Sequence, residues 1–410
     1  MSNKDTLLAQ PLKIGPRTAV NRFAINAMEC CDADENGNLT EKSLERYSNL
    51  FRGNAGFIDF ESITMQYESR ARDKQISIAP DNYDAMGRFI RQMKDINDKP
   101  LLIFQLNHSG EISDDEFSQR ICVKPLPGWE GQMVSEAYID QVIEDFVVAA
   151  KALYDMGADG VDLKLSHGYL GTQMLRPYND RNWKYGGSWQ NRSRFAFEMF
   201  ERVRKEIPDK NFLLGSKVSM WEKFPGGFGC ESPTSPVMDL SEPIDLVKGL
   251  QERGASYILQ STGNCRITNW EHMPNPMKPD DVYMHFTMSK IIKDNLKPET
   301  VVIGSAYSLL SDGRSDLQGV TPQQKTLTYW GNYNIEHGIT DMIALGRQSL
   351  ADPLLPAKYE QDRDDEIHWC TACGLCGKLL RSQNNVGCVV YNPPYTRLLK
   401  KLRAAGQKIG

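Results

Sequence analysis

Four cysteines near the carboxyl end of the chain have the spacing of a metal or cluster site. Cys370, Cys373 and Cys376 are separated by two residues each, and Cys388 follows eleven residues later. In a reducing compartment such a pattern is more typical of a metal site than of disulfides. Four thiolates suit an iron-sulfur cluster or tetrahedral zinc, because both are held by soft sulfur. The sequence predicts a 4Fe-4S cluster, with zinc as the main alternative and unliganded thiols as a less favoured one.

A second group of reactive residues lies near the middle of the chain, where Lys164, His167 and Tyr169 occur within one short segment. An ammonium and an imidazole can polarise a substrate oxygen. A tyrosine hydroxyl, with an ordinary pKa of about 10, can donate a proton at neutral pH. We therefore take these three residues as candidate catalytic groups, with Tyr169 as the proton donor.

Two glycine-containing segments, VVIGSAY and IALGR, have the composition of a phosphate site. Gly304 and Gly346 allow close approach of the backbone, and Arg347 can donate two hydrogen bonds to a phosphate. A turn glycine and a surface arginine are the structural alternative. We expect a phosphate-bearing cofactor here.

These residues are positioned by a repeating pattern, in which a short apolar run is followed by a polar connection and an amphipathic stretch. Two of the expected helices span residues 136–157 and 189–207. The eight expected strands span residues 23–28, 56–62, 100–108, 160–166, 212–219, 256–262, 301–307 and 341–347. Eight such α/β units predict a TIM (β/α)8 barrel. A doubly wound open sheet is less favoured, because no GxGxxG follows the first strand.

Strand parity predicts which side chains point into the barrel, because alternate residues of a strand face opposite sides. Asp162 and Lys164 are expected to face inward, together with Gln105 and Lys217. A buried amine is costly unless it meets an anion or opens onto the barrel mouth, where the active sites of this fold lie. The two lysines therefore indicate a bound polar ligand. The alternative for Lys164 is a structural ion pair with Asp162.

The expected domains are a barrel over residues 1–360 and a cysteine-rich segment over residues 361–410 packed on it.

Cys30 and Cys31 are expected to be small buried hydrophobes at the barrel mouth. His108 is either a member of the site or a satisfied core histidine. An insert after the sixth strand fits a lid or a satellite core; its residues are Trp270, His272, Met273, Met277, Tyr283 and Met284.

The composition of the chain argues against a protein that binds nucleic acid or spans a membrane. The chain is 40% hydrophobic and 25% charged, as expected of a globular protein, and its net charge of −5 offers no basic stripe for nucleic acid or an anionic membrane. It has no apolar run of the roughly 20 residues that cross a bilayer and no secretory signal at its start. We expect a cytoplasmic protein with a small-molecule substrate that forms a homo-oligomer.

The chain resembles the old yellow enzyme family of FMN-dependent oxidoreductases over nearly its whole length. The matching stretches include RGNAGFIDFES, IFQLNHSG, GADGVDLKLSHGYLGTQMLRPYNDRNWKYGGSWQNRSRF and ITDMIALGRQSLADP. The cysteine tail is similar to that of the branch containing 2,4-dienoyl-CoA reductase and trimethylamine dehydrogenase, whose members carry FMN and a four-iron cluster. The resemblance implies that Cys370, Cys373, Cys376 and Cys388 bind the cluster. It also implies that FMN is bound by Ala27, Met28, Glu29, Ser62, Gln105, Lys217, Gly304, Ser305, Gly346 and Arg347.

Four positions depart from the family's pattern. Lys164 replaces a histidine that commonly pairs with His167 on a carbonyl oxygen, and could instead hold a substrate carboxylate. Lys217 stands where arginine is usual, and Glu29 where a small residue or cysteine is usual. The gap between Cys373 and Cys376 is two residues instead of three, which leaves zinc as an alternative to iron.

The resemblance implies an ene-reductase, in which hydride reaches an activated C=C bond of an enoate or enone and Tyr169 supplies the proton. A dehydrogenase or demethylase that passes electrons to a carrier protein is the alternative, and a non-catalytic zinc-stapled barrel is a more remote one. The longer relatives continue into FAD- and NAD-binding domains, whereas this chain ends at Gly410. We therefore expect electrons from NAD(P)H directly or from a separate electron-transfer protein.

Overall fold

The computed structural model describes residues 2–273, 279–310 and 326–407. Eight parallel strands close into a barrel in the order β12-β13-β14-β3-β4-β5-β8-β9. Their bounds are β3 (Phe23–Ile25), β4 (Phe57–Thr64), β5 (Leu101–Asn107), β8 (Gly160–Leu163), β9 (Leu213–Ser219), β12 (Tyr257–Ser261), β13 (Val301–Gly304) and β14 (Met342–Leu345). The predicted TIM barrel is confirmed, and each expected strand run overlaps one of these strands, although β4 continues two residues past the expected end at residue 62.

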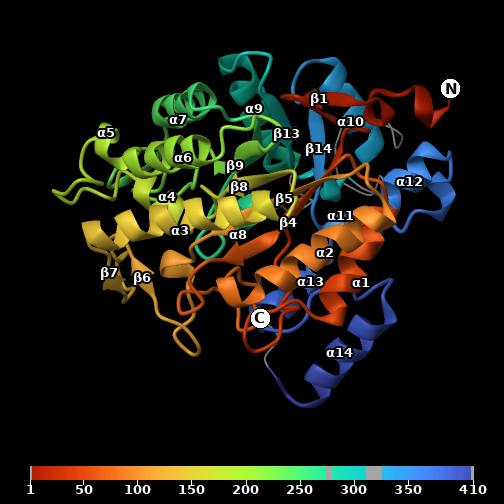
Figure 1. Cartoon of the computed structure of the whole chain (residues 1–410), viewed down its shortest axis with the longest axis horizontal. Coiled ribbons are helices and arrows are strands. Elements are labelled where there is room, and N and C mark those ends of the chain that lie inside the picture. The colour runs from red at the N-terminus through yellow and green to blue at the C-terminus, as the bar shows by residue number, and fades with distance from the viewer. Residues whose placement is uncertain (1, 274–278, 311–325, 408–410) are drawn as a thin grey trace.

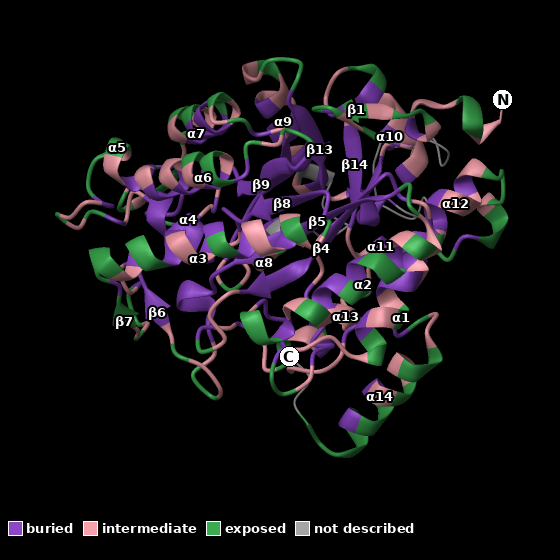
Figure 2. Cartoon of the chain, viewed as in Figure 1, coloured by how far each residue is buried: buried purple, intermediate pink, exposed green. Residues whose placement is uncertain are grey.

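Helices surround the barrel, and Figure 1 shows the strands at the centre of the molecule with helices around them. The helices are α1 (Glu41–Arg52), α2 (Tyr83–Ile96), α3 (Glu136–Asp155), α4 (Leu170–Leu175), α5 (Trp189–Arg192), α6 (Arg194–Glu206), α7 (Ser241–Glu252), α8 (Asn269–His272), α9 (Pro279–Asn295), α10 (Leu327–Glu336), α11 (Arg347–Ala351), α12 (Leu355–Glu360), α13 (Leu375–Arg381) and α14 (Pro393–Ala404). The eight barrel strands are buried throughout, and exposed residues lie on the outer helices and loops (Figure 2).

The barrel interior changes character along its axis. Its amino-terminal end is apolar, filled by side chains such as Phe57, Leu101 and Ile103, and the hairpin of β1 (Leu12–Ile14) and β2 (Arg17–Ala19) packs against it. Further along the same inward rows the side chains become polar. In β5, for example, Gln105 follows Ile103 on the inner face. The polar layer therefore lies at the carboxyl end of the strands, where ligands of this fold bind.

Several expected elements differ in their bounds; β3 and β13, for example, each end three residues before the expected end, and two other differences have a local cause. The fourth strand was expected to reach residue 166, but β8 ends at Leu163, because the chain then turns to form the loop that carries His167 and Tyr169. The helix expected over residues 189–207 is interrupted at Ser193, between α5 and α6. The Ser193 hydroxyl bonds the Gln190 carbonyl there, which is the kind of local bond that competes with regular helix geometry.

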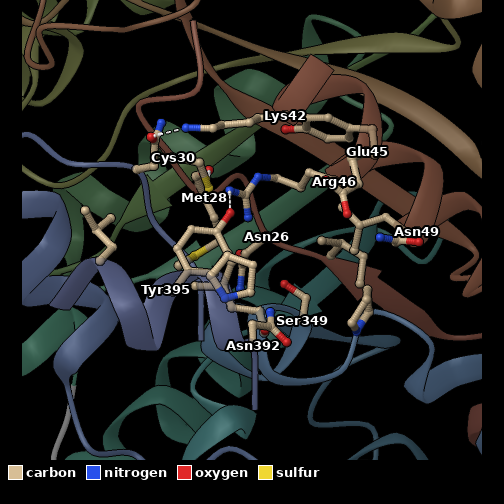
Figure 3. A pocket seen from close by; sticks show the side chains of 18 of the residues that line it. Asn26, Met28, Cys30, Lys42, Glu45, Arg46, Asn49, Ser349, Asn392 and Tyr395 are labelled. Atoms are coloured by element: carbon tan, nitrogen blue, oxygen red, sulfur yellow. Dashed lines mark hydrogen bonds between the residues drawn. The ribbon is translucent and has the colours of Figure 1, made fainter. Parts of the chain in front are cut away.

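The C-terminal segment packs beside α1, as Figure 1 shows for α14. Arg46 of α1 donates to the Val386 carbonyl at 2.6 Å and to the Tyr395 hydroxyl at 3.1 Å, and its Nε donates to Asp32 at 2.7 Å. A cavity of about 480 Å³ lies around these contacts, between α1, α11 and α14 (Figure 3). None of the helices in the described parts of the chain is long and apolar enough to cross a bilayer.

Candidate functional site

A cavity at the carboxyl ends of the strands brings together most of the predicted site residues. All three candidate catalytic residues, Lys164, His167 and Tyr169, line it. The residues predicted to bind FMN that also line it are Ala27, Met28, Glu29, Gln105, Lys217, Ser305, Gly346 and Arg347. Ser62 and Gly304 do not line it, although the Ser62 hydroxyl accepts a hydrogen bond from Lys164 at 3.3 Å.

The floor of the cavity is a network of inward-facing polar residues. Gln105 donates to Asp162 at 2.7 Å, and the backbone N–H of Lys217 donates to the same carboxylate at 2.7 Å. The Lys217 ammonium donates to the Asn26 side chain at 2.8 Å. Burial lowers the pKa of Lys217 to about 8, although Asp59 and Asp162 oppose the shift. Lys217 thus offers a nearby cation to a ligand that rests on this floor.

Glu29 is the centre of a charged network on one wall of the cavity. Its carboxylate accepts a hydrogen bond from Arg72 Nε at 2.7 Å and lies 3.5 Å from Lys164 Nζ. The Tyr169 hydroxyl donates to the same carboxylate at 2.8 Å. Burial by itself would raise the pKa of Glu29, but Arg72, Lys164 and the Tyr169 hydrogen bond outweigh it and hold the pKa at about 2. Glu29 is therefore ionised at neutral pH.

Tyr169 and Lys164 contact each other directly within this wall. The Lys164 ammonium lies 3.5 Å from the centre of the Tyr169 ring, in a cation–π contact. Burial, followed by the charge of Glu29, raises the pKa of Tyr169 well above its usual value, so the hydroxyl keeps its proton at neutral pH. Lys164 is paired with Glu29, and not with Asp162 as in the structural alternative for this lysine.

His167 is held at the cavity by an unusual loop conformation. Its backbone φ is +64°, and the next residue, Gly168, has φ of +85°. A side chain at Gly168 would clash with Asn264, whose Nδ2 lies 2.1 Å from the position of an added Cβ. The His167 ring nitrogen Nε2 bonds the Ser261 hydroxyl at 2.7 Å. This loop therefore needs glycine after the histidine, and the bond to Ser261 fixes the orientation of the ring.

Lining residues that follow β13 and β14 suit the phosphate of FMN. A Cβ added at Gly346 would lie 3.4 Å from Met28 Sδ, so the missing side chain leaves space at the cavity wall. Arg347 and Ser305 also line the cavity and offer a cation and a hydroxyl. Because Gln105 and Lys217 offer donors at the floor, the donor set as a whole suits a flavin ring joined to a phosphate.

Arg72 and Cys265 are two of the seven lining residues that the sequence analysis missed; the other five are Asn26, Ser261, Ala306, Ser308 and Leu380. Arg72 lies in the loop after β4, eight residues beyond Thr64, where neither strand parity nor a place directly after a strand marks it. The thiol of Cys265 is neutral at physiological pH, because burial raises its pKa to about 11. Both residues face the Glu29 network.

The other residues singled out from the sequence lie mostly in the core, outside the cavity. His108 is a satisfied core histidine, because its two ring nitrogens bond Tyr138 and the Gly110 N–H, and burial lowers its pKa to about 3. Cys30 and Cys31 are buried, as expected. In the insert after β12, Met273 lines the cavity, as a lid residue would. Tyr283 and Met284 pack against the main core, Trp270 is exposed, and Met277 lies outside the described residues.

The four cysteines of the tail converge without forming a complete ligand sphere. Cys376 and Cys388 pack in one cluster with Cys30. Burial raises the pKa of Cys370 to about 11, and its neighbours include the Arg347 guanidinium, which opposes the shift. Across the described residues, no group of three or more His, Cys, Asp or Glu side chains is arranged to hold a metal ion. The iron-sulfur or zinc site therefore stays a prediction.

The tail also contacts the two loops that carry Glu29 and Arg72. The Gln383 side chain bonds the backbone on both sides of Arg72, since it accepts from the Asp73 N–H at 3.2 Å and donates to the Ala71 carbonyl at 3.4 Å. The Val386 N–H donates to the carbonyl of Cys30, the residue after Glu29, at 3.0 Å. The tail thus fixes the backbone at the charged wall of the cavity.

A buried carboxyl beneath this wall leads to a prediction about stability. Burial, reinforced by the charge of Asp32, raises the pKa of Glu61 to about 8. Between about pH 4.5 and 8 the folded chain keeps this proton while the unfolded chain has lost it, so the free energy of unfolding falls as pH rises through that window. Glu61→Gln keeps an acceptor for the Cys30 N–H, which Glu61 bonds at 3.0 Å. We expect this variant to be more stable than the wild type at pH 8 by about 3–4 kcal/mol.

Urea unfolding of both proteins at pH 5 and pH 8 measures this difference. Glu252→Gln, at an exposed position at the end of α7, serves as the control and should leave the pH dependence unchanged. Parallel pH profiles for the wild type and Glu61→Gln would show that Glu61 does not titrate in this window.

The fold and the cavity define a class of protein. A closed eight-stranded barrel whose carboxyl end holds a cavity lined by cations, hydrogen-bond donors and a buried tyrosine is consistent with a flavin-dependent oxidoreductase. The NADH:flavin oxidoreductase / NADH oxidase family matches residues 7–249, and the chain belongs to this family. The membership confirms the resemblance to the old yellow enzymes and excludes the non-catalytic scaffold.

Curated relatives carry several activities. The chain is 26% identical to the NADH oxidase of Thermoanaerobacter brockii, over 92% of this chain and 52% of the relative. It is 25% identical to the cinnamate reductase of Clostridium sporogenes, over 96% of this chain and 58% of the relative. It is 26% identical to the dimethylamine dehydrogenase of Hyphomicrobium sp., over 90% and 48%. The chain thus spans about half the length of these relatives.

Solved structures agree with the fold. A 2-naphthoyl-CoA reductase in complex with 2-naphthoyl-CoA superposes with a TM-score of 0.80 at 19% identity, covering 95% of this chain and 57% of that chain. The old yellow enzyme homologue of Zymomonas mobilis gives a TM-score of 0.64 at 20% identity, covering 87% of this chain and 92% of that chain. These likenesses support the barrel architecture.

Proposed function

We propose that this protein is an ene-reductase that reduces a C=C bond activated by a carbonyl or carboxyl group. Bound FMN would supply the hydride, which adds to the β-carbon of the substrate. Tyr169 delivers a proton to the α-carbon, so one C–H bond forms at each end of the former double bond. His167 and Lys164 bind the activating oxygen, which carries increasing negative charge as the hydride adds.

The observation that carries this proposal is the state of Tyr169 in the cavity wall. Its hydroxyl keeps its proton at neutral pH, since burial and Glu29 raise its pKa. The conjugate base that forms on proton transfer would lie beside Lys164 and Arg72, whose charges stabilise it. A general acid needs both properties, and delivery of the proton further requires the Tyr169 O–H to turn from the Glu29 carboxylate towards the substrate.

The charge of the wall favours a reductase over an amine dehydrogenase. Oxidation of an amine requires the cavity to accept a substrate that is largely cationic at neutral pH. Glu29 is the anion available to such a substrate on this wall, but Arg72 and Lys164 already neutralise it. With Lys164 protonated, the network of these three groups carries one net positive charge, which repels a cation and attracts an anion. Burial lowers the pKa of Lys164, and the charge of Glu29 opposes this shift.

The cofactors follow from the same arrangement. We propose that FMN is held by Gln105 and Lys217 at the cavity floor and by Ser305, Gly346 and Arg347 at the phosphate end. We further propose that Cys370, Cys373, Cys376 and Cys388 hold an iron-sulfur cluster, with zinc as the alternative. The proximity of Arg347 to Cys370 supports a position for the cluster beside the phosphate end.

Anaerobic stopped-flow measurements on the FMN-loaded protein test this function. The dithionite-reduced protein is mixed with a panel of enoates and enones. In a separate experiment, the oxidised protein is mixed with secondary and tertiary amines. We expect the flavin absorbance to return on mixing with at least one enoate or enone, with formation of the saturated product. Reduction of the oxidised protein by amines, with no reaction towards any C=C compound, would instead establish the dehydrogenase. Iron and zinc are quantified in the same sample.

A further inference from the structure

Arg72 uses part of its hydrogen-bonding capacity inside the cavity wall. Its Nε donates to Glu29 at 2.7 Å. The two terminal nitrogens, Nη1 and Nη2, make no hydrogen bond to any residue in the described parts of the chain, and the residue lines the cavity. The side chain is 13% exposed, so these donors are largely removed from bulk water. Two parallel N–H donors in this state match the two oxygens of a carboxylate.

The surrounding charges leave a place for an anion. Glu29 faces two cations, Arg72 and Lys164, and its charge balances one of them. The other ionisable groups that face Arg72 are Tyr169, Cys31 and Cys265. All three are neutral at physiological pH, because burial raises the pKa of each. A bound carboxylate would bring this part of the cavity to electroneutrality.

The Arg72 guanidinium is also held in place before any ligand arrives. Glu29 holds the Nε edge of the Arg72 guanidinium. Gln383 bonds the backbone of Ala71 and Asp73, the residues before and after Arg72. Restricting the side chain in advance reduces the entropy that binding has to overcome. A flexible surface arginine would lack this advantage.

We propose that the terminal nitrogens of Arg72 bind a carboxylate of the substrate, so that the site selects unsaturated acids over neutral carbonyl compounds and amines. This inference rests on the proposed ene-reductase function, which it makes specific. In such an acid the carboxylate is also the activating group, so Arg72 would hold it together with Lys164, which contacts the same Glu29 carboxylate. Glu29 then acts as a positioning residue, because it holds both the arginine and the tyrosine.

Calorimetric titration of the FMN-loaded protein with two matched, unreactive ligands tests the inference. The ligands are 3-phenylpropanoate and its uncharged analogue 3-phenylpropanamide. We expect the wild type to bind the carboxylate more tightly. Arg72→Gln should weaken binding of the carboxylate by at least about 30-fold, as loss of a buried charge partner does, and change binding of the amide by no more than about twofold.

Two further variants separate a binding role from a structural one. Arg72→Lys keeps the charge but lacks the fork, and should weaken carboxylate binding by about 10-fold, as expected for the loss of one charge-assisted hydrogen bond. Arg70→Gln is the matched control, because Arg70 lies in the same loop and is similarly buried but bonds Tyr67 and Asp73 outside the cavity. It should bind both ligands as the wild type does.

The inference is overturned if the wild type binds the amide as tightly as the carboxylate. It is equally overturned if Arg72→Gln retains wild-type affinity for the carboxylate, or loses both ligands equally. Turnover separates this result from the proposed function. Reduction of neutral enones without preference for acids would leave the ene-reductase and remove the anion site. Binding of the carboxylate that depends on Arg72, with no C=C reduction, would support the anion site and contradict the proposed ene-reductase function.

Discussion

Tyr169→Phe is expected to slow reduction of the C=C substrate by about 10²–10⁴-fold, the contribution typical of a positioned general acid. The substitution removes the hydroxyl that donates to Glu29 at 2.8 Å but keeps the ring on which the Lys164 ammonium lies. The cavity therefore keeps its shape and loses the proton. Without it, the carbanion that develops at the α-carbon must wait for a proton from water.

Single-turnover measurements isolate this effect. The rate at which the reduced protein is reoxidised by substrate should fall, while the rate of its reduction by NAD(P)H and its FMN content should stay close to wild type. Tyr138→Phe is the control, since Tyr138 bonds His108 and Gln66 and does not line the cavity. An unchanged reoxidation rate in Tyr169→Phe would assign the proton donor to another group.

Arg176→Met is expected to lower the free energy of unfolding by about 3–5 kcal/mol, the cost of leaving a buried charge without its partner. Arg176 is buried and pairs with two buried carboxylates, Glu111 at 2.6 Å and Glu222 at 2.7 Å. Methionine fills a similar volume but leaves both carboxylates without a cation. Glu222 also accepts from Asn264, which packs against Gly168, so the loss should extend to the loop that carries His167.

Equilibrium urea unfolding of the FMN-loaded protein measures this loss. Arg202→Ala removes an ion pair with Glu144 in which both side chains are more than 40% exposed, and should cost less than about 1 kcal/mol. A loss of less than 1 kcal/mol in Arg176→Met would mean that Glu111 and Glu222 are satisfied by water or by protonation. Burial already raises the pKa of Glu111, which makes protonation the route by which the cost would be reduced.

The candidate site was predictable where its residues lie on strands or directly after them. Gln105 and Lys217 follow from strand parity, and the segment from Lys164 to Tyr169 follows from the end of the fourth strand. Arg72 could not be identified in this way. It lies in an irregular loop, and its role depends on Glu29, which comes from a different loop 43 residues earlier.

The sequence by itself determined the barrel, its inward polar layer and the cysteine pattern. Each of these is encoded locally, because strand periodicity and residue spacing do not depend on distant parts of the chain. Only the tertiary structure decided how Glu29 joins Tyr169, 140 residues away, to Arg72 and Lys164, and how Gln383 of the tail holds the Arg72 loop. Ion pairs and hydrogen bonds of this kind act over a few ångströms. Their partners are therefore fixed by how the loops pack at the barrel mouth, and the net charge that the site presents to a substrate is fixed with them.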